Sequence, residues 1–230
     1  MTALVAALAR RARRDGDRPL VTYYDLGTGS RTELSGRTFA NWVDKSYHLL
    51  AELDVQPGDE VALPIATTHP GHWVTVVLAA GAWQAGAVVV PRPSDGAVVT
   101  AVGPDGVGTE TAGTVLACSL HPLGFGFHEP LPAGVIDFSV DVRSQPDAHA
   151  EEPVAESAPA WRDGTEVLSH ADLAAAYPVS DRVLVRPTTP LATLTAAYIA
   201  PLLGGGSAVV VLGDDEEAIS RIVAEERVGR

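Results

Sequence analysis

Apolar residues fall into short continuous runs that alternate along the chain with longer segments of helical spacing. The continuous runs, rich in valine and alanine, lie at residues 61–65, 85–91, 97–102, 114–120, 134–140, 181–187 and 207–213. The segments of helical spacing lie at residues 3–14, 39–53, 70–84, 169–177, 191–203 and 214–228. Continuous apolar runs are typical of strands covered on both faces, and their alternation with helices indicates parallel βαβ units. The pattern predicts a doubly wound α/β fold with a mainly parallel sheet and flanking helices.

Two stretches depart from this alternation. Residues 19–25 and 31–35 are extended runs joined through Gly27 and Gly29, which is the pattern of a hairpin. Residues 141–160 carry Gln, Pro, Asp, His, Glu and Ser with few large apolar side chains, as linkers do. We expect residues 1–230 to form a single domain with a loose segment at about 141–160.

The charge balance excludes some classes of partner. The 230 residues include 29 acidic and 16 basic side chains, for a formal net charge of -13. Non-specific binding to nucleic acid or to anionic membranes needs a surplus of Lys and Arg, so neither is expected. No apolar stretch reaches the roughly 18 residues of a membrane-spanning helix. At the N-terminus the arginines follow the apolar part, the reverse of a signal peptide, so we expect a cytoplasmic protein.

The residues that could carry chemistry form weak patterns. Cys118 is three residues from His121, but it lies inside an apolar run, where a buried and unreactive thiol is expected rather than a nucleophile. His69 and His72 could share one face, yet no third metal ligand is near them. The glycines of residues 204–206 follow a helix, whereas a phosphate cradle precedes one. We therefore predict no catalytic residue and no metal site.

Four segments together resemble a known superfamily in order and spacing. They are VQPGDEVALPI at 55–65, LAAGAWQAGAVVVP at 78–91, the stretch 181–212, which begins DRVLV, and ISRIVAEERV at 219–228. The order resembles the N-terminal part of the adenylate-forming superfamily of acyl-CoA synthetases, peptide adenylation domains and luciferases. The resemblance covers nearly all of this chain but less than half of a full-length enzyme. It implies the fold of the N-terminal half, with the C-terminal catalytic half absent.

This chain departs from that family where the family binds ATP. The family places a phosphate loop close to TSGTTGxPKG ahead of an SH..L helix. Here LSHADL at 168–173 stands for the helix, but only APAWRDGTEV precedes it. Lys45, the single lysine, lies on a predicted helix far from that loop, and the family's adenine site, ribose site and adenylation lysine would lie beyond Arg230. This truncated pattern resembles a small actinobacterial family of AMP-binding-like proteins of unknown function.

A weak nucleotide or phosphate site could survive at the remnant of that loop. Its candidate residues are Gly164, Thr165, Ser169 and His170. Ser169 is placed to cap the following helix, whose free N–H groups would attract an anion. Nearby carboxylates would repel phosphate, namely Asp163, Glu166 and Asp172. We expect the site to be empty of ATP or AMP, with Gly164 and Thr165 forming a simple turn as the alternative.

These observations lead to one main functional hypothesis and its alternatives. The main one is a non-catalytic AMP-binding-like domain, a pseudoenzyme that acts as an interaction or small-ligand module without a cofactor. The alternative is a residual acyl- or nucleotide-handling enzyme related to acyl-CoA synthetases and completed by another chain. A third hypothesis is one subunit of a split enzyme whose partner carries the remaining half. In the full-length family the C-terminal half covers part of this domain, so that apolar surface would need another protein to bury it here. The apolar runs 191–203 and 207–212 therefore predict a homodimer or another protein partner.

Overall fold

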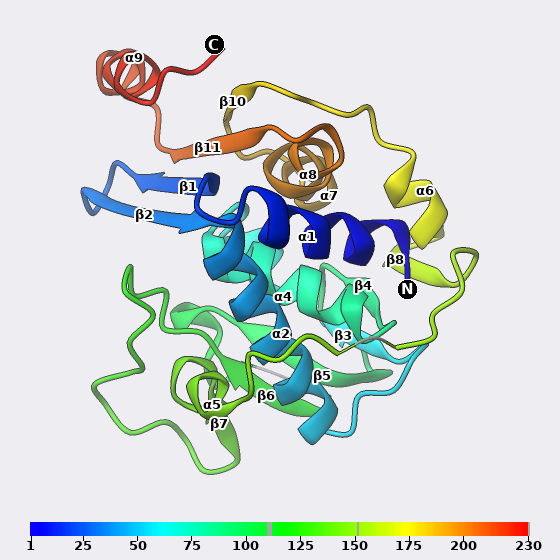
Figure 1. Cartoon of the computed structure of the whole chain (residues 1–230). Helices are drawn as coiled ribbons and strands as arrows, with labels where there is room; N and C mark the ends of the chain where they lie inside the picture. The colour runs from blue at the N-terminus through cyan, green and yellow to red at the C-terminus, as the bar shows by residue number, and fades with distance from the viewer. Residues whose placement is uncertain (110–111, 151, 230) are drawn as a thin grey trace.

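The computed structural model describes residues 1–109, 112–150 and 152–229, and it arranges the strands in two sheets with helices between and around them (Figure 1). The first sheet has the order β10-β11-β1-β2 and the second the order β7-β6-β5-β3-β4-β8-β9. The first consists of β1 (Pro19–Asp25), β2 (Ser30–Ser35), β10 (Arg182–Val185) and β11 (Ser207–Leu212). The second consists of β3 (Glu60–Ala62), β4 (Val88–Val90), β5 (Ala97–Val102), β6 (Thr114–Ala117), β7 (Val135–Asp137), β8 (Pro159–Asp163) and β9 (Glu166–Ser169).

Parallel pairing dominates both sheets, which confirms the predicted fold class. Only the hairpins β1–β2 and β8–β9 pair antiparallel in the described chain. The other pairs are parallel, as in β1–β11, β3–β5 and β5–β6. The predicted hairpin at residues 19–35 is therefore present as β1–β2, whereas the hairpin β8–β9 was not expected from the sequence.

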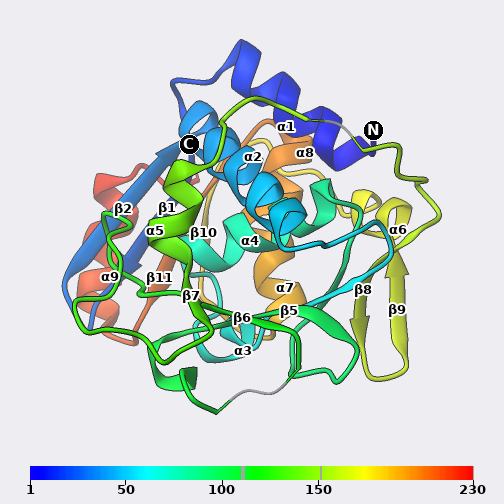
Figure 2. The same cartoon turned by 90° about the horizontal axis from the view of Figure 1, so that it is seen from below.

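Helices fill the space between the two sheets and cover their outer sides. They are α1 (Ala3–Arg14), α2 (Gly36–Glu52), α3 (Ile65–Thr68), α4 (Trp73–Gln84), η1 (Pro104–Gly106), α5 (Phe138–Ser144), α6 (His170–Ala174), α7 (Pro190–Leu194), η2 (Thr195–Ile199), α8 (Ala200–Gly204) and α9 (Glu216–Glu225). All twelve residues of α4 are buried, as its apolar sequence predicts, and it lies in the layer between the sheets (Figures 1 and 2). No helix within residues 1–109, 112–150 and 152–229 combines the length and apolar character needed to cross a bilayer.

The segment predicted as loose contains regular structure at both ends. β7 stops at Asp137, three residues before the predicted end of the strand, because the Asp137 carboxylate accepts the N–H groups of Ser139 and Val140 and caps α5. α5 covers residues 138–144 and β8 begins at Pro159, so regular structure enters both ends of that segment, and the single domain over residues 1–230 stays a prediction. Glu151 lies outside the described residues, and the looseness of the remainder stays a prediction.

The apolar runs that were expected to form a dimer face are mostly core. β11, which contains the run 207–212, lies inside its sheet between β10 and β1, and residues 207–211 are buried. The run 191–203 is a helix in three parts, α7, η2 and α8, and Leu194, Tyr198 and Leu202 on it are buried. Gly205 ends this helix in the left-handed region at φ +82°, the usual conformation of a glycine that caps a helix.

Candidate functional site

The residues predicted as the loop remnant form the tip of the β8–β9 hairpin. Gly164, at φ +61°, and Thr165 are the two residues between the strands and form a two-residue turn. Asp163 and Glu166 are directly opposite each other in the hairpin register, so two carboxylates flank the turn. Asp163 accepts a hydrogen bond from Arg92, with 2.9 Å between Nε and Oδ1, whereas Glu166 is exposed and has no ion-pair partner among the described residues.

Ser169 and His170 lie at the opposite end of β9. At ~3.3 Å per strand residue, Thr165 and Ser169 are ~13 Å apart, so the structure does not bring the four predicted residues together. Ser169 Oγ accepts the N–H of Asp172 at 3.1 Å, and the Asp172 carboxylate accepts the Ser169 N–H at 2.9 Å. The Ser169 hydroxyl also donates to the Asp172 carboxylate at 2.6 Å, and this bond, followed by the one from the Ser169 N–H, lowers the pKa of Asp172. Together these contacts form a capping box, so the groups at the start of the five-residue α6 are paired with one another.

His170 is fully buried, and neither of its ring nitrogens has a hydrogen-bond partner in the part of the chain that the structure describes. Burial lowers the pKa of His170, with only a partial opposing effect from Glu156, so the ring is held neutral. A neutral imidazole supplies no charge for a phosphate. Phosphate or nucleotide binding at these four residues therefore stays a prediction, and the expected outcome remains an empty site.

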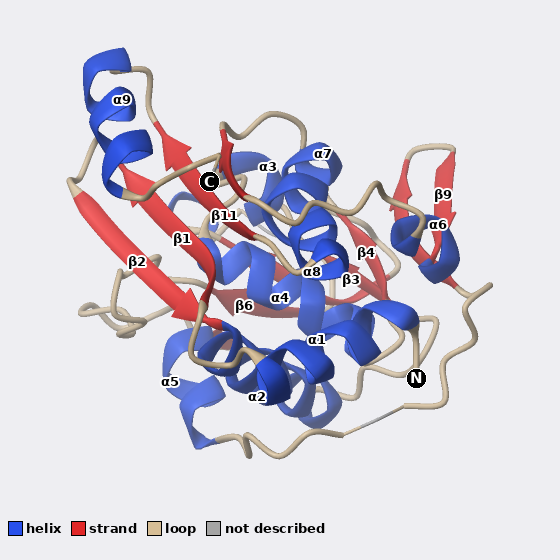
Figure 3. Cartoon of the chain, turned by 45° about the horizontal axis from the view of Figure 1, so that its top comes forward, coloured by secondary structure: helices blue, strands red, loops and turns tan. Residues whose placement is uncertain are grey.

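A groove of about 800 Å³ runs beside the hairpin, between β8, β10 and the three-part helix α7–η2–α8. We call this space the groove. Its walls are formed by Trp161, Asp163, Glu166, Tyr177, Val179, Val183, Leu184, Val185, Thr189, Pro190, Leu191, Ala192, Thr195, Ala196 and Ala200. Figure 3 shows β9 and α6 standing to one side of α7 and α8. A mostly apolar concave surface of this size is typical of small-molecule sites.

The groove has room beside the α7–η2–α8 helix because small side chains of that helix face it. Ala192, Thr195 and Ala196 are partly exposed on that face, at spacings of three and four residues. Leu194, Tyr198 and Ile199 are buried away from it, and Tyr198 stacks on Phe39 with 5.0 Å between the ring centroids. The segment Thr195–Ile199 has π-helical hydrogen bonding, a rare local geometry that is frequent at functional sites. The sequence predicted a plain helix here, because a π-turn has no composition signal of its own.

Trp161 supplies an unused hydrogen-bond donor in the wall of the groove. Only 1% of Trp161 is exposed, and its Nε1 finds no acceptor among the described residues. Trp83, by contrast, donates from Nε1 to the carbonyl oxygen of Ala160 at 2.8 Å. A buried donor without an acceptor costs roughly 1–3 kcal/mol. An acceptor on a bound molecule would recover that free energy.

The remaining candidate residues have structural roles. Cys118 is fully buried, and burial raises the pKa of its thiol well above the ordinary value, so no thiolate forms. His72 caps α4 by accepting the N–H of Val74 at Nδ1, and burial lowers the pKa of His72 to about 3. Lys45 Nζ donates to main-chain carbonyls of Arg143 and Gln145, which ties α2 to the end of α5. Within the described ranges no three His, Cys, Asp or Glu side chains gather as a metal site.

Comparisons with solved structures give the same fold. The chain superimposes on an acyl-CoA synthetase of Brucella canis with a TM-score of 0.76 at 18% identity, covering 99% of this chain and 46% of that one. It matches the N-terminal domain of FACL13 from Mycobacterium tuberculosis with a TM-score of 0.70 at 18% identity, over 99% of this chain and 62% of that one. For the anthranilate CoA ligase AuaEII in complex with anthranoyl-AMP the TM-score is 0.68 at 18% identity, over 97% and 48% of the two chains. The chain thus spans roughly half the length of these structures, and the predicted N-terminal fold of adenylate-forming enzymes is confirmed.

The sequence comparison identifies a family. No family model matches the chain. The chain is 35% identical over 239 residues to a TIGR03089 family protein of Mycobacterium tuberculosis, and the match covers 95% of this chain and 93% of that protein. Because the identity extends over nearly the whole of both chains, this chain belongs to the TIGR03089 family.

Proposed function

We propose that this protein is a non-catalytic, cytoplasmic binding module built on the adenylate-forming fold, with the groove as its ligand site. The observation that carries the proposal is the short turn at the tip of the β8–β9 hairpin. Where the resemblance expects a phosphate loop ahead of LSHADL, two residues, Gly164 and Thr165, turn the chain between Asp163 and Glu166. This replaces a loop that would surround phosphates with a tight turn between carboxylates.

Charge argues against adenylation at this hairpin. Adenylyl transfer needs groups that offset the charge developing on the phosphates. Arg92 is engaged by Asp163, and the ammonium of Lys45 is held by main-chain carbonyls between α2 and α5. A nucleotide at the hairpin would also meet the unpaired carboxylate of Glu166 on a chain of net charge -13. We infer that ATP and AMP are not ligands.

The groove supports the binding half of the proposal. It has the volume of a small-molecule site, a mostly apolar wall and the unused donor of Trp161. Ala196 on η2 is the natural place to block it, because a large side chain there would project into the groove. Ala224, exposed on α9, offers a matched control for the same substitution at a position that does not line the groove.

Two measurements test the proposal together. The purified chain should give no ATP–pyrophosphate exchange with any carboxylic acid. In a thermal-shift screen of nucleotides, CoA and apolar small molecules, only apolar compounds should raise the midpoint of unfolding, since a ligand of the native state stabilises it by mass action. Ala196→Trp should remove that shift and Ala224→Trp should keep it. Exchange by the chain alone, abolished by a substitution within it, would contradict the proposal.

One observation favours a second candidate. The solved structures that the chain matches are roughly twice as long, so a second polypeptide could complete an acyl- or nucleotide-handling enzyme. In that case exchange activity would appear only when such a polypeptide is added to this chain. A homodimer or another protein partner over the groove is a related expectation. Light scattering at micromolar concentration tests the homodimer, because a 24 kDa particle would leave the groove open.

A further inference from the structure

Two carboxylates and no basic side chain lie among the described residues that line the groove. The two carboxylates are those of Asp163 and Glu166. Asp163 forms an ion pair with Arg92, whose guanidinium donates to both carboxylate oxygens, at 2.9 and 3.5 Å. Glu166 has no such partner among the described residues. One carboxylate at the groove is therefore left to meet a charge that arrives with a ligand.

Nearby arginines do not cancel this charge. Arg186 follows the groove-lining Val185, but its guanidinium is paired with Glu216 at 2.5 Å and also contacts the carbonyl of Gly213. Arg162 alternates away from Trp161 along β8 and is paired with Glu60. Both side chains are committed elsewhere, so the described part of the chain offers a ligand carboxylate or phosphate no free cation among the groove-lining residues.

The interior of the groove adds two requirements. Its aliphatic wall, which includes Val183, Val185 and Leu191, favours an apolar body. The unpartnered Nε1 of Trp161 favours an acceptor, such as a carbonyl oxygen, on that body. We infer that the groove selects amphiphilic amines, with an apolar body, a carbonyl acceptor and a cationic head that pairs with Glu166. This inference rests on the proposed function, because both need the groove to bind a ligand.

Three probes that share one body isolate the head group. N-octanoyl-ethylenediamine carries an ammonium, N-propyl-octanamide a neutral end and N-octanoyl-glycine a carboxylate, and all three keep the same chain and amide carbonyl. Isothermal titration calorimetry on the full chain should show the amine binding about fivefold more tightly than the neutral amide, the effect of one partly exposed ion pair. The acid should bind more weakly than the neutral amide. Added salt should reduce the preference, because it screens the exposed pair.

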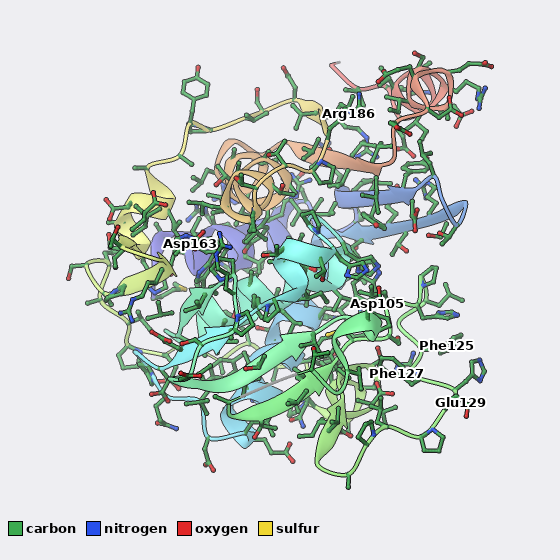
Figure 4. The ribbon with its side chains drawn as sticks, turned by 180° about the vertical axis from the view of Figure 1, so that it is seen from behind. Asp105, Phe125, Phe127, Glu129, Asp163 and Arg186 are labelled. Atoms are coloured by element: carbon green, nitrogen blue, oxygen red, sulfur yellow. The ribbon has the colours of Figure 1, made fainter. Side chains whose placement is uncertain are left out.

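Glu166→Gln and Glu129→Gln form a matched pair of variants. Both remove one exposed carboxylate and change the net charge equally, but Glu129 lies on the loop after β6, across the molecule from Asp163 and the hairpin (Figure 4). Glu166→Gln should abolish the preference for the amine while leaving binding of the neutral amide unchanged. Glu129→Gln should retain the preference. Trp161→Phe should weaken all three probes by a similar factor, since they share the carbonyl.

Each outcome bears on a distinct claim. If the acid binds as well as the amine, the inference fails while the proposed function stands. If none of the three probes binds, both fail. A preference for the amine that survives Glu166→Gln, or that Glu129→Gln removes equally, would trace it to net charge and overturn the assignment to this hairpin. Thermal midpoints of the variants, measured without probe, show that each is folded.

Discussion

Helix α4 and the β8–β9 hairpin both pack near β4, yet Trp83 on the helix and Trp161 on the hairpin differ in what their ring nitrogens contact. Trp83 on α4 is buried among apolar residues, and its ring nitrogen donates to the carbonyl of Ala160. Trp161 on β8 is equally buried, but its donor has no acceptor in the described chain and its ring lines the groove. Trp73, at the start of α4, is also buried with an unpartnered Nε1, but it does not line the groove. An unpartnered donor beside a cavity, rather than burial or unsatisfied polarity alone, is what distinguishes the groove region from core in this fold.

The same contrast holds for carboxylates. Glu226, at the end of α9, accepts hydrogen bonds from Tyr24, Arg31 and Arg182, and its side chain is 11% exposed. Glu166 at the hairpin tip is exposed and has no ion-pair partner in the described residues. Glu226 therefore acts in folding, by joining α9 to the first sheet, whereas Glu166 is free to act on something outside the chain.

The largest expected effect is at Trp83. Trp83→Ala should lower the free energy of unfolding by about 3–5 kcal/mol, because it leaves a large cavity and removes the donor for the Ala160 carbonyl. Trp161→Phe should cost less than 1 kcal/mol, since the packing lost with the larger ring is offset by removal of a buried donor that has no acceptor in the described chain. Urea denaturation measures both. Equal losses for the two variants would break the comparison between these tryptophans.

An intermediate effect is expected from Glu226. Burial alone would raise its pKa, but hydrogen bonds from Tyr24, Arg182 and Arg31 lower the pKa to about 2, from an ordinary value of 4.5. The carboxylate therefore stabilises the fold fully above pH 4.5, and the contribution is lost as the pH falls toward 2. Glu226→Gln should cost about 1–2 kcal/mol at pH 7 and progressively less in acid. Urea midpoints across this range check it, and an equal loss at pH 7 and at pH 2 would contradict it.

The smallest effect concerns the hairpin turn itself. Gly164→Ala should cost about 1 kcal/mol, because φ at this position is +61° and an alanine there is strained. No atom lies within 4 Å of the added Cβ, so the cost is conformational and not steric. Gly164→Asn should cost less, since asparagine tolerates the left-handed region. If Asn and Ala are equally harmful, the backbone conformation is not what the glycine provides.

Much of the fold follows from patterns in the sequence. The valine-rich runs predicted β5, β6 and β11 because continuous apolar segments have no stable place except inside a covered sheet. The apolar sequence of α4 likewise fixed its burial, and the position of Cys118 in such a run fixed its inertness. These features are local, since each depends on what a short segment must hide from water.

The hairpin and the groove could not be obtained in the same way. β8 and β9 are short and carry Asp163, Glu166 and other polar residues, so they lack the alternation that marks a strand, and only the pair Asp163–Gly164 signals a turn. The residues of the groove come from β8, β9, β10 and the α7–η2–α8 helix, which are separated by up to about 40 positions in the chain.

The sequence by itself determined the α/β class, the mainly parallel pairing, the buried helix α4 and the absence of a lysine other than Lys45. Only the tertiary structure decided that Gly164 and Ser169 sit at opposite ends of β9, that the runs 191–203 and 207–212 are largely core, and that Trp161 and Glu166 share one groove. The physical reason is that hydrophobic periodicity depends on residues close together in the sequence. Whether a donor or a carboxylate has a partner depends instead on which residues from distant parts of the chain pack beside it.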